Sequence, residues 1–353
     1  MAVTRRRKGL GIPGGLDVAA QFGFVLTGGM NLRLLLGIFL FSFVSVFGAE
    51  LRLGMIGLDT SHVTAFTELL NNPENKKHVP GGKVVAAFKG GSPDIESSAS
   101  RVEGYTKTLE EKYGVKIVPT IEELCREVDA VLLMSVDGRP HLEQAKPVIA
   151  AKKPMFIDKP MAGSLKDVLT IFRLAKVENV PVFSSSSYRF YESLVELQKT
   201  DIGEIKGAIS YGPCTYEEHH PDLFWYGVHA TEALFTVMGT GLETVTRVAT
   251  KDTDVVTGVW TDGRVGTLRG LRNASTPHKV ILFGTKAVAE QKGSGDYAPL
   301  VGEIITFFQT GHPPVSADET IEMFAFMEAA DESKRQDGKP VSIREVLRKA
   351  STP

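Results

Sequence analysis

Two basic side chains stand where this sequence could carry out proton transfer. Lys159 follows a short apolar run that ends at Ile157, and His229 stands at the start of an apolar stretch with helical spacing. A histidine titrates near neutral pH, and an apolar wall or a second cation lowers the pKa of a lysine toward that range. Oxidation of an alcohol needs a base for the hydroxyl proton while a hydride leaves the carbon. The two residues are therefore candidates for acid/base chemistry, such as the proton transfer of an alcohol oxidation; the alternatives are an exposed lysine and a structural histidine.

The stretch GLDTSH, residues 57–62, lies between a predicted strand and a predicted helix, where the pyrophosphate of a dinucleotide usually binds. Only Gly57 remains of the three glycines in the usual fingerprint. Asp59 stands where the backbone approaches the phosphate, and a carboxylate there would repel it. Thr60 and Ser61 could cap the helix and offer hydroxyl groups to a phosphate. We therefore expect Gly57, Thr60 and Ser61 to contact a cofactor, although the altered motif alone does not specify a dinucleotide.

The acidic residue that would hold the ribose hydroxyls, expected about twenty residues further on, is missing. The second predicted strand ends in FKGG, and Lys89 occupies the corresponding place. Lys89 either pairs with the 2′-phosphate of NADP or is a solvated loop residue. The sequence thus leaves NAD and NADP open as the cofactor.

Polar and aromatic residues near the middle of the chain are candidates for a substrate cleft. Tyr188 and Arg189 follow a run of serines at the expected junction between two domains. The triplet FWY at residues 224–226, with Trp225 at its centre, offers an aromatic surface on which a sugar ring could stack. The alternative for the triplet is a place in the hydrophobic core.

The segment EEHH, residues 217–220, could bind a metal ion. Adjacent histidines point apart unless the backbone bends, so a solvated or substrate-contacting loop is the preferred interpretation. A metal-dependent lyase that uses Asp59, His62 and either His141 or His219 has little support from their spacing. We therefore predict no metal site.

Strands and helices alternate in the first half of the chain, which predicts a parallel sheet built from right-handed crossovers. We expect a doubly wound α/β domain of the Rossmann type over residues 51–185. Lys159 then follows the carboxyl end of a strand, where open α/β sheets bind ligands. The predicted strands are 51–57, 83–88, 130–134, 155–157 and 182–183, and the predicted helices are 63–70, 121–128, 141–151 and 165–176.

The pattern changes after residue 185 to segments that alternate like antiparallel strands. The Asp262-Gly263 pair between two of them is a hairpin signal. We predict an α+β domain with an open sheet over residues 186–345, with the domain boundary near residues 183–188. Its predicted strands are 207–211, 245–249, 255–260, 265–271 and 279–283, framed by helices at 230–238 and 320–335.

Six short motifs resemble, in type and order, those of the Gfo/Idh/MocA oxidoreductases, a family that includes glucose–fructose oxidoreductase and inositol dehydrogenase. The DKP triplet is similar to the Glu-Lys-Pro signature of that family, with aspartate in place of glutamate. The resemblance covers roughly residues 51–345. The motifs are SVDGRPH (135–141), AKKP (151–154), DKP (158–160), GVHATE (227–232), GHPPVSAD (311–318) and GKPV (338–341).

The resemblance implies a Rossmann domain, an open-sheet α+β domain, and a sugar or polyol site between them that works with NAD or NADP. It implies that Lys159 contacts the substrate hydroxyl and the cofactor, that Ser135 contacts the cofactor, and that His229 is the site histidine. The family has an aspartate four residues before that histidine, and here Trp225 takes its place, three residues away from Asp222. An indole cannot accept a proton, so this site departs from the family pattern. The family's open sheet also implies a homo-oligomer.

The chain has 353 residues, 40 basic and 42 acidic side chains, and 42% hydrophobic residues. This composition is typical of a globular protein of two domains and gives no reason to expect a nucleic-acid partner. Its two cysteines, Cys125 and Cys214, cannot build a disulfide framework or a zinc cluster, and we expect both to stay unpaired.

Residues 1–49 form a basic leader that ends in an uncharged run. The run from Leu34 to Ala49 follows Arg33 and closes with small residues. A basic flank, an apolar core of this length and a small-residue end are typical of a secretory signal peptide. We therefore expect export, with Met30 as an alternative start; the competing interpretation is an uncleaved membrane anchor.

The sequence favours an exported NAD(P)-linked oxidoreductase that acts on a sugar, a polyol or a related carbohydrate derivative. The alternative is a member of the same fold that has lost redox turnover and binds carbohydrate, or a non-redox, lyase-like enzyme. The lost glycines of the turn and Trp225 motivate that alternative. A compartment without free nicotinamide cofactor would further require that any cofactor be tightly held.

Overall fold

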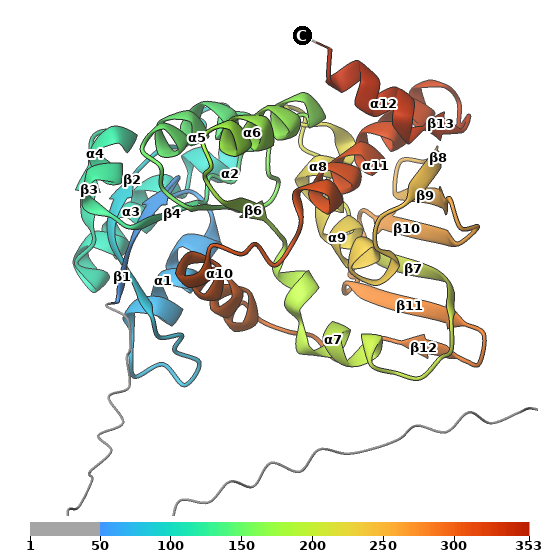
Figure 1. Ribbon diagram of the computed structural model, residues 1–353, viewed down its shortest axis with the longest axis horizontal. Coiled ribbons are helices and arrows are strands. Elements are labelled where there is room, and N and C mark those ends of the chain that lie inside the picture. Colours follow the sequence, from blue (N-terminus) through green and yellow to red (C-terminus); the bar gives the residue numbers. More distant parts are fainter. Residues whose placement is uncertain (1–49, 353) are drawn as a thin grey trace, which may run out of the picture. The chain divides into compact units, whose positions relative to one another are not determined.

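The computed structural model describes residues 50–352 (Figure 1). The predicted signal peptide lies in residues 1–49, outside the described residues. Within residues 50–352, no helix combines the length and the apolar character that a membrane crossing requires.

The first half of the described chain forms a six-stranded parallel sheet with the order β3-β2-β1-β4-β5-β6. Every residue of β4 is buried, as expected for a central strand covered on both faces. The chain turns from one direction of winding to the other between β1 and β4, so a crevice opens at their carboxyl ends. The predicted doubly wound sheet is confirmed. Its strands are β1 (Leu51–Ile56), β2 (Gly82–Phe88), β3 (Lys116–Val118), β4 (Ala130–Leu133), β5 (Met155–Ile157) and β6 (Val182–Ser184).

Hydroxyl side chains mark the starts of several helices. Thr120, Ser164 and Ser316 each accept a hydrogen bond from the backbone N–H three residues further on, which satisfies a donor that the helix itself leaves unpaired. The helices between the strands of the first sheet are α1 (Ser61–Asn71), α2 (Glu96–Ala99), α3 (Val102–Tyr113), α4 (Ile121–Glu127), α5 (His141–Ala150) and α6 (Leu165–Val177). The sequence patterns predicted α1, α4, α5 and α6, whereas α2, α3 and β3 were not expected.

The second half forms a seven-stranded sheet with the order β12-β11-β7-β10-β9-β8-β13. The predicted hairpin at Asp262-Gly263 is confirmed, because β9 and β10 pair antiparallel on either side of it. The expectation of antiparallel pairing fails for β7 and β10, which lie parallel. Two helices and two strands separate them in the chain and provide the crossover that a parallel pair needs. The strands are β7 (Ile205–Pro213), β8 (Leu242–Ala249), β9 (Thr253–Trp260), β10 (Val265–Leu271), β11 (Lys279–Gly284), β12 (Val288–Glu290) and β13 (Val341–Ser342).

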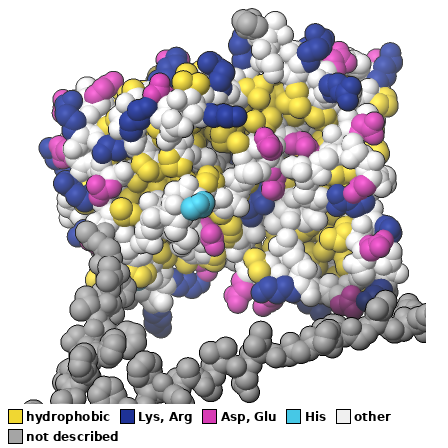
Figure 2. Space-filling view, viewed as in Figure 1, with side chains coloured by type: hydrophobic (Ala, Val, Ile, Leu, Met, Phe, Trp, Pro, Cys, Tyr) yellow, Lys and Arg dark blue, Asp and Glu magenta, His cyan; other side chains and the backbone are white. Residues whose placement is uncertain are grey.

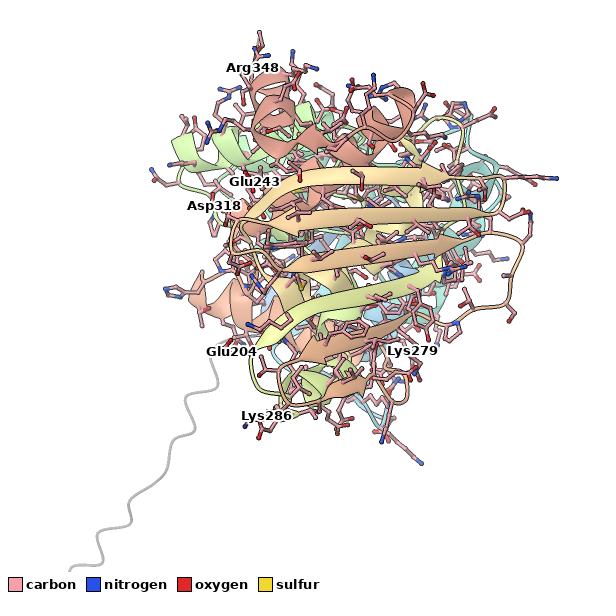
Figure 3. All side chains as sticks on the ribbon, turned by 90° about the vertical axis from the view of Figure 1, so that its right-hand side faces the viewer. Glu204, Glu243, Lys279, Lys286, Asp318 and Arg348 are labelled. Carbon is pink, nitrogen blue, oxygen red and sulfur yellow. The ribbon has the colours of Figure 1, made fainter. Side chains whose placement is uncertain are left out.

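Helices cover one face of the second sheet, where α9 packs on β7 and β10 and α11 packs on β8. Figure 3 shows the other face, on which the strands lie without covering helices. Cys125 and Cys214, in the first and second halves of the chain, are both buried and unpaired, as predicted. The remaining helices are α7 (Glu192–Gln198), α8 (Asp222–Trp225), α9 (Gly227–Met238), α10 (Ala298–Thr310), α11 (Ala317–Arg335), α12 (Ile343–Ala350) and the short 3-10 helix η1 (Ser187–Phe190).

Helix α10 belongs by packing to the first domain, although it follows the second sheet in the chain (Figure 1). Its buried face joins the core that contains Leu53 of β1 and Phe66 of α1. The ring of Phe307 lies edge-on to that of Phe183 in β6, with 4.8 Å between the centroids. β6 ends at Ser184, and α10, which lies within the predicted range 186–345, packs in the core of the first sheet.

Candidate functional site

A cavity of about 260 Å³ opens at the carboxyl edge of the first sheet, between the two halves of the described chain. Its wall combines the start of α1, the segment of α2 and the start of α3, the loop after β4, the second residue after β5, the segment around η1, the junction of α8 with α9, and the residue before α10. The lining residues are Thr60, Ser61, His62, Ser97, Arg101, Val136, Lys159, Ser187, Tyr188, Tyr191, Trp225, Tyr226, His229 and Tyr297. Six residues predicted from the sequence meet here: Thr60, Ser61, Lys159, Tyr188, Trp225 and His229.

Lys159 follows β5 and lies where the crevice of the sheet opens. Burial lowers the pKa of its amine, against the opposing effect of the neighbouring Asp158 carboxylate. The Nζ atom lies 5.7 Å from the ring centroid of Tyr226, within range of a cation–π contact. Lys159 is thus a desolvated amine in the lining of the cavity.

His229 lies in the first turn of α9 and is 6% exposed. Its Nδ1 atom is 2.8 Å from the hydroxyl oxygen of Ser186, and its ring contacts the edges of Tyr188 and Tyr226. Burial holds the pKa of this imidazole well below its ordinary value, and the nearby Lys159 adds to the effect. His229 is therefore a neutral imidazole at pH 7, able to share a hydrogen bond with a ligand hydroxyl.

The carboxylate that the family pattern places before His229 has no equivalent in this segment. Trp225 lines the cavity and packs on the ring of His220 at 4.9 Å. Asp222 lies one helical turn earlier, and its Oδ2 accepts hydrogen bonds from Arg247 at 2.7 Å and Lys334 at 2.6 Å. Asp222 is thus engaged with these two cations and does not pair with His229.

A histidine–carboxylate pair that the sequence did not predict lies in the same cavity. The Nδ1 atom of His62 is 2.6 Å from Oδ2 of Asp158. The ring stacks on Phe66 at 5.6 Å with 3° between the planes, and the edge of Tyr297 contacts it at 4.8 Å. The available signal was His62 itself, which takes the place of the third glycine of the fingerprint. Its partner, the aspartate of the DKP triplet, lies too far along the chain for spacing to pair the two.

His278 is a second residue that the sequence did not indicate. Its ring lies 4.1 Å from that of Tyr188 and 5.5 Å from that of His229. Both of its ring nitrogens are buried without a hydrogen-bond partner among the described residues. Burial lowers the pKa of His278 to about 4, so it supports the wall of the cavity as a neutral ring.

Gly57 and Ser135 lie beneath the cavity and not in its lining. Gly57 adopts φ +83, and a Cβ atom added there would lie 2.2 Å from the hydroxyl oxygen of Ser135. Ser135 donates a hydrogen bond to the side chain of Gln144 at 2.9 Å. These two residues therefore set how closely the turn after β1 approaches the turn after β4.

The carboxyl group of Asp59 points into the protein, which removes the expected repulsion of a phosphate. Asp59 is fully buried; it accepts hydrogen bonds from the hydroxyl of Ser98 at 2.6 Å and from the backbone N–H of Val136 at 2.9 Å. Burial raises the pKa of this carboxyl group. The cavity side of the turn instead presents Thr60, Ser61 and the start of α1, a combination that suits the phosphates of a dinucleotide.

Lys89 and Arg189 lie outside the cavity lining. The ammonium of Lys89 forms an ion pair with the carboxylate of Glu103, and the predicted contact with a 2′-phosphate would compete with this pair. Arg189 is largely buried and forms ion pairs with Glu232 and Glu319, which fasten η1 to α9 and α11. The structure thus places Arg189 behind the wall that Tyr188 presents to the cavity.

The EEHH segment forms a hydrogen-bonded network with the loop after β4. Both His219 and His220 contact the carboxylate of Glu217, and Nε2 of His220 is 3.1 Å from Oδ1 of Asp137. Glu217 and Asp94 together raise the pKa of His219. Within residues 50–352, no cluster of three or more histidine, cysteine or acidic side chains is arranged to hold a metal ion.

Comparison with known proteins relates the first domain to a family. Residues 51–186 match the model of an oxidoreductase family with an NAD-binding Rossmann fold, the Gfo/Idh/MocA family. The comparison with curated proteins gave no match.

Solved structures share the fold over most of the chain. A probable dehydrogenase from Thermotoga maritima is 22% identical, with a TM-score of 0.69, over 84% of this chain and 100% of its own. The scyllo-inositol dehydrogenase of Lactobacillus casei, solved with NAD(H) and scyllo-inositol, is 13% identical with a TM-score of 0.69, over 83% of this chain and 99% of its own. The myo-inositol dehydrogenase of Lactobacillus casei, solved with NAD(H) and myo-inositol, is 16% identical with a TM-score of 0.66, over 83% of this chain and 96% of its own. At these identities the likeness concerns the fold.

Proposed function

We propose that this protein is an NAD(P)-linked oxidoreductase that acts on a sugar, a polyol or a related carbohydrate derivative, because residues 51–186 match the model of the Gfo/Idh/MocA oxidoreductase family. The observation that carries the proposal is the meeting of Lys159 and His229 in one cavity at the crevice of the first sheet. Two structural neighbours with the same fold were solved with NAD(H) and an inositol, which supports the same class of substrate.

The residues of the cavity divide into two groups by the chemistry that they offer. Thr60, Ser61 and the start of α1 would hold the phosphates of the dinucleotide, whose nicotinamide supplies a two-electron hydride acceptor. Lys159 would hold the substrate oxygen, because a buried ammonium stabilises the negative charge that develops there. Trp225 and Tyr226 present apolar rings that suit the C–H face of a sugar ring.

Cofactor binding and turnover of the purified protein test this proposal. We expect NAD(H) or NADP(H) to bind, and expect NAD⁺ or NADP⁺ to be reduced with a panel that includes myo-inositol and scyllo-inositol. The variant Lys159→Ala loses about 10²- to 10⁴-fold in kcat, the range typical of a group that acts on a transferred proton or its oxygen. Lys166, an exposed lysine on α6, provides the matched control, and Lys166→Ala keeps the wild-type rate.

Failure to bind either cofactor would contradict the proposal. If a carbohydrate of the panel still bound without cofactor, that result would favour the redox-inactive alternative. Two features motivate this alternative: Gly57 is the only fingerprint glycine that remains in the turn, and Trp225 replaces the usual aspartate.

We further propose that the protein is exported and assembles as a homo-oligomer. Export is supported by the uncharged run from Leu34 to Ala49 behind Arg33. Amino-terminal sequencing of the mature protein should find the leader removed, and an intact leader in the membrane fraction would support an anchor instead. The uncovered face of the second sheet supports self-association (Figure 3). Native mass spectrometry gives the subunit number and detects a retained cofactor.

A further inference from the structure

We propose that His62, oriented by Asp158, is the acid/base group that exchanges the substrate proton in this cavity; the inference rests on the proposed function and names a residue for its chemistry. His62 stands in the α1 turn, where the usual nucleotide fingerprint has a glycine. This chain therefore has an imidazole where the usual fingerprint has no side chain. The His62 ring lines the same cavity as Lys159 and His229.

The surroundings of His62 fix both its orientation and its tautomer. Phe66 stacks parallel to the ring from the next turn of α1, and Tyr297, just before α10, contacts both rings, with centroid distances of 4.8 Å to His62 and 5.7 Å to Phe66. Nδ1 is held 2.6 Å from Oδ2 of Asp158, so this nitrogen carries the hydrogen that it donates to the carboxylate. Nε2 is then the nitrogen with a free lone pair, on a ring that lines the cavity.

Asp158 is suited to orient an imidazole. Its side chain is 3% exposed, and its Oδ1 atom makes no hydrogen bond among the described residues. Although burial opposes ionisation, the close contacts with His62 and Lys159 hold the pKa of Asp158 below its usual range. A buried carboxylate of this kind stabilises the imidazolium that forms when Nε2 takes a proton.

His229 is less suited to the same task. Its Nδ1 atom pairs with the hydroxyl of Ser186, not with a carboxylate. Burial holds the pKa of His229 well below its ordinary value, and the charge of Lys159 lowers it further. No residue of α8 compensates, because Trp225 stands where a carboxylate would be needed. His229 is therefore assigned to hydrogen bonding of the substrate and His62 to proton transfer.

The step that follows is balanced in atoms and electrons. The substrate hydroxyl gives its proton to Nε2 of His62, and the oxidised nicotinamide of the proposed function would accept the hydride from the same carbon. The C–O bond becomes a carbonyl, and the imidazolium later releases the proton to water through the cavity mouth. In the reverse direction the imidazolium protonates the alkoxide oxygen. Lys159 holds that oxygen throughout.

The kinetic test uses the full-length protein with NAD⁺ or NADP⁺ and whichever polyol of the panel the wild type oxidises. We expect His62→Gln to lower kcat by about 10²- to 10⁴-fold, while KM and the cofactor affinity change less than about threefold. Added imidazole should restore part of the rate of His62→Ala but none of the rate of Lys159→Ala. His78 is the matched control, because it bonds only to the carbonyl of Leu69, outside the cavity, and His78→Gln should keep the wild-type rate.

A second measurement needs no turnover. In protein with ¹⁵N-labelled histidine, the His62 signals are identified by their loss in His62→Gln, and we expect an Nδ1–H tautomer. Asp158→Asn should shift these signals and leave those of His78 in place. Circular dichroism of each variant establishes that it is folded.

The outcomes separate this inference from the proposed function. A wild type that binds neither cofactor contradicts the proposed function. If the wild type turns over and His62→Gln keeps the same kcat, the inference is contradicted and the proposed function is not. The inference is also overturned when the His62 signals do not respond to Asp158→Asn, or when His62→Gln loses cofactor affinity in proportion to its rate, since His62 would then only shape the turn.

Discussion

Gly57 is the residue of the nucleotide-binding turn that a side chain would disrupt most. Its φ of +83 disfavours any L-residue by about 1–2 kcal/mol. A Cβ atom would also lie within 2.5 Å of the backbone of Ser135, and such crowding costs about 1–3 kcal/mol more. We therefore expect Gly57→Ala to lower the free energy of unfolding by about 2–5 kcal/mol, as measured by urea denaturation.

The chain offers a matched control for this prediction in the hairpin between β9 and β10. Gly263 has nearly the same φ, +85, but no atom lies within 4 Å of a Cβ added there. Gly263→Ala should thus show the backbone cost alone, about 1–2 kcal/mol. Equal losses for the two variants would show that the contact with Ser135 is not what demands glycine at residue 57.

At the scale of single residues, the sequence predicts which side chains gather but not which way they face. Lys159 and His229 were predicted because their residue types and motifs are informative by themselves. The orientation of Asp59 depends on Val136, which is 77 residues away, and no local pattern carries that information. The His62–Asp158 pair, 96 residues apart, was missed for the same reason.

At the scale of elements, strands and helices with a strong periodic pattern were predicted and those without one were not. β4 is an uninterrupted apolar run, and α6 has a regular apolar face behind its Ser164 cap. By contrast, β13 spans two residues and exists only because β8 offers it a hydrogen-bonding edge. Short elements of this kind are stabilised by tertiary contacts, so the local sequence does not specify them.

A buried cluster of charged side chains lies at the packing interface between the second sheet and α11. Arg247 of β8 donates hydrogen bonds to Asp254 of β9 and to Asp331 of α11. Burial raises the pKa of Asp331 to about 7; Arg247 opposes this rise, while the Asp222 carboxylate adds to it. The folded protein therefore holds a proton on Asp331 at pH values where the unfolded chain, with an ordinary pKa near 3.8, has released it.

This difference makes stability depend on pH with a defined sign. The contribution of Asp331 to the free energy of unfolding is present at low pH, begins to fall above about pH 4, and is lost as the pH rises through about 7. Relative to Asp331→Asn, the wild type should lose roughly 1–2 kcal/mol between pH 5.5 and pH 8. Urea denaturation of both proteins at the two pH values measures this difference in the free energy of unfolding. Asp318→Asn, at the exposed start of the same helix, should run parallel to the wild type, and parallel curves for Asp331→Asn would refute the prediction.

At the scale of the whole molecule, the two sheets are not independent bodies. Ion pairs of Arg189 join η1 to α9 and α11, and the cavity is lined from both halves of the chain. Acidic and basic side chains lie interspersed over the face shown in Figure 2, which agrees with the nearly balanced charge of the sequence. The sequence predicted two successive domains but did not predict that α10 packs against the first sheet. The apolar face of a helix does not specify which of two hydrophobic cores it joins.

Helix α10 gives the last prediction, because its core residues lie far in the sequence from the domain that they complete. Phe307 is fully buried against Phe183, and Phe→Ala changes in such sites cost about 3–5 kcal/mol. We expect Phe307→Ala to lose that stability and to accelerate amide hydrogen exchange in β1 more than in β9. Thr306→Ala, an exposed change on the same helix, should alter neither. Faster exchange confined to β9 would mean that α10 stabilises the second sheet instead, because a cavity at residue 307 weakens first the strands that pack around it.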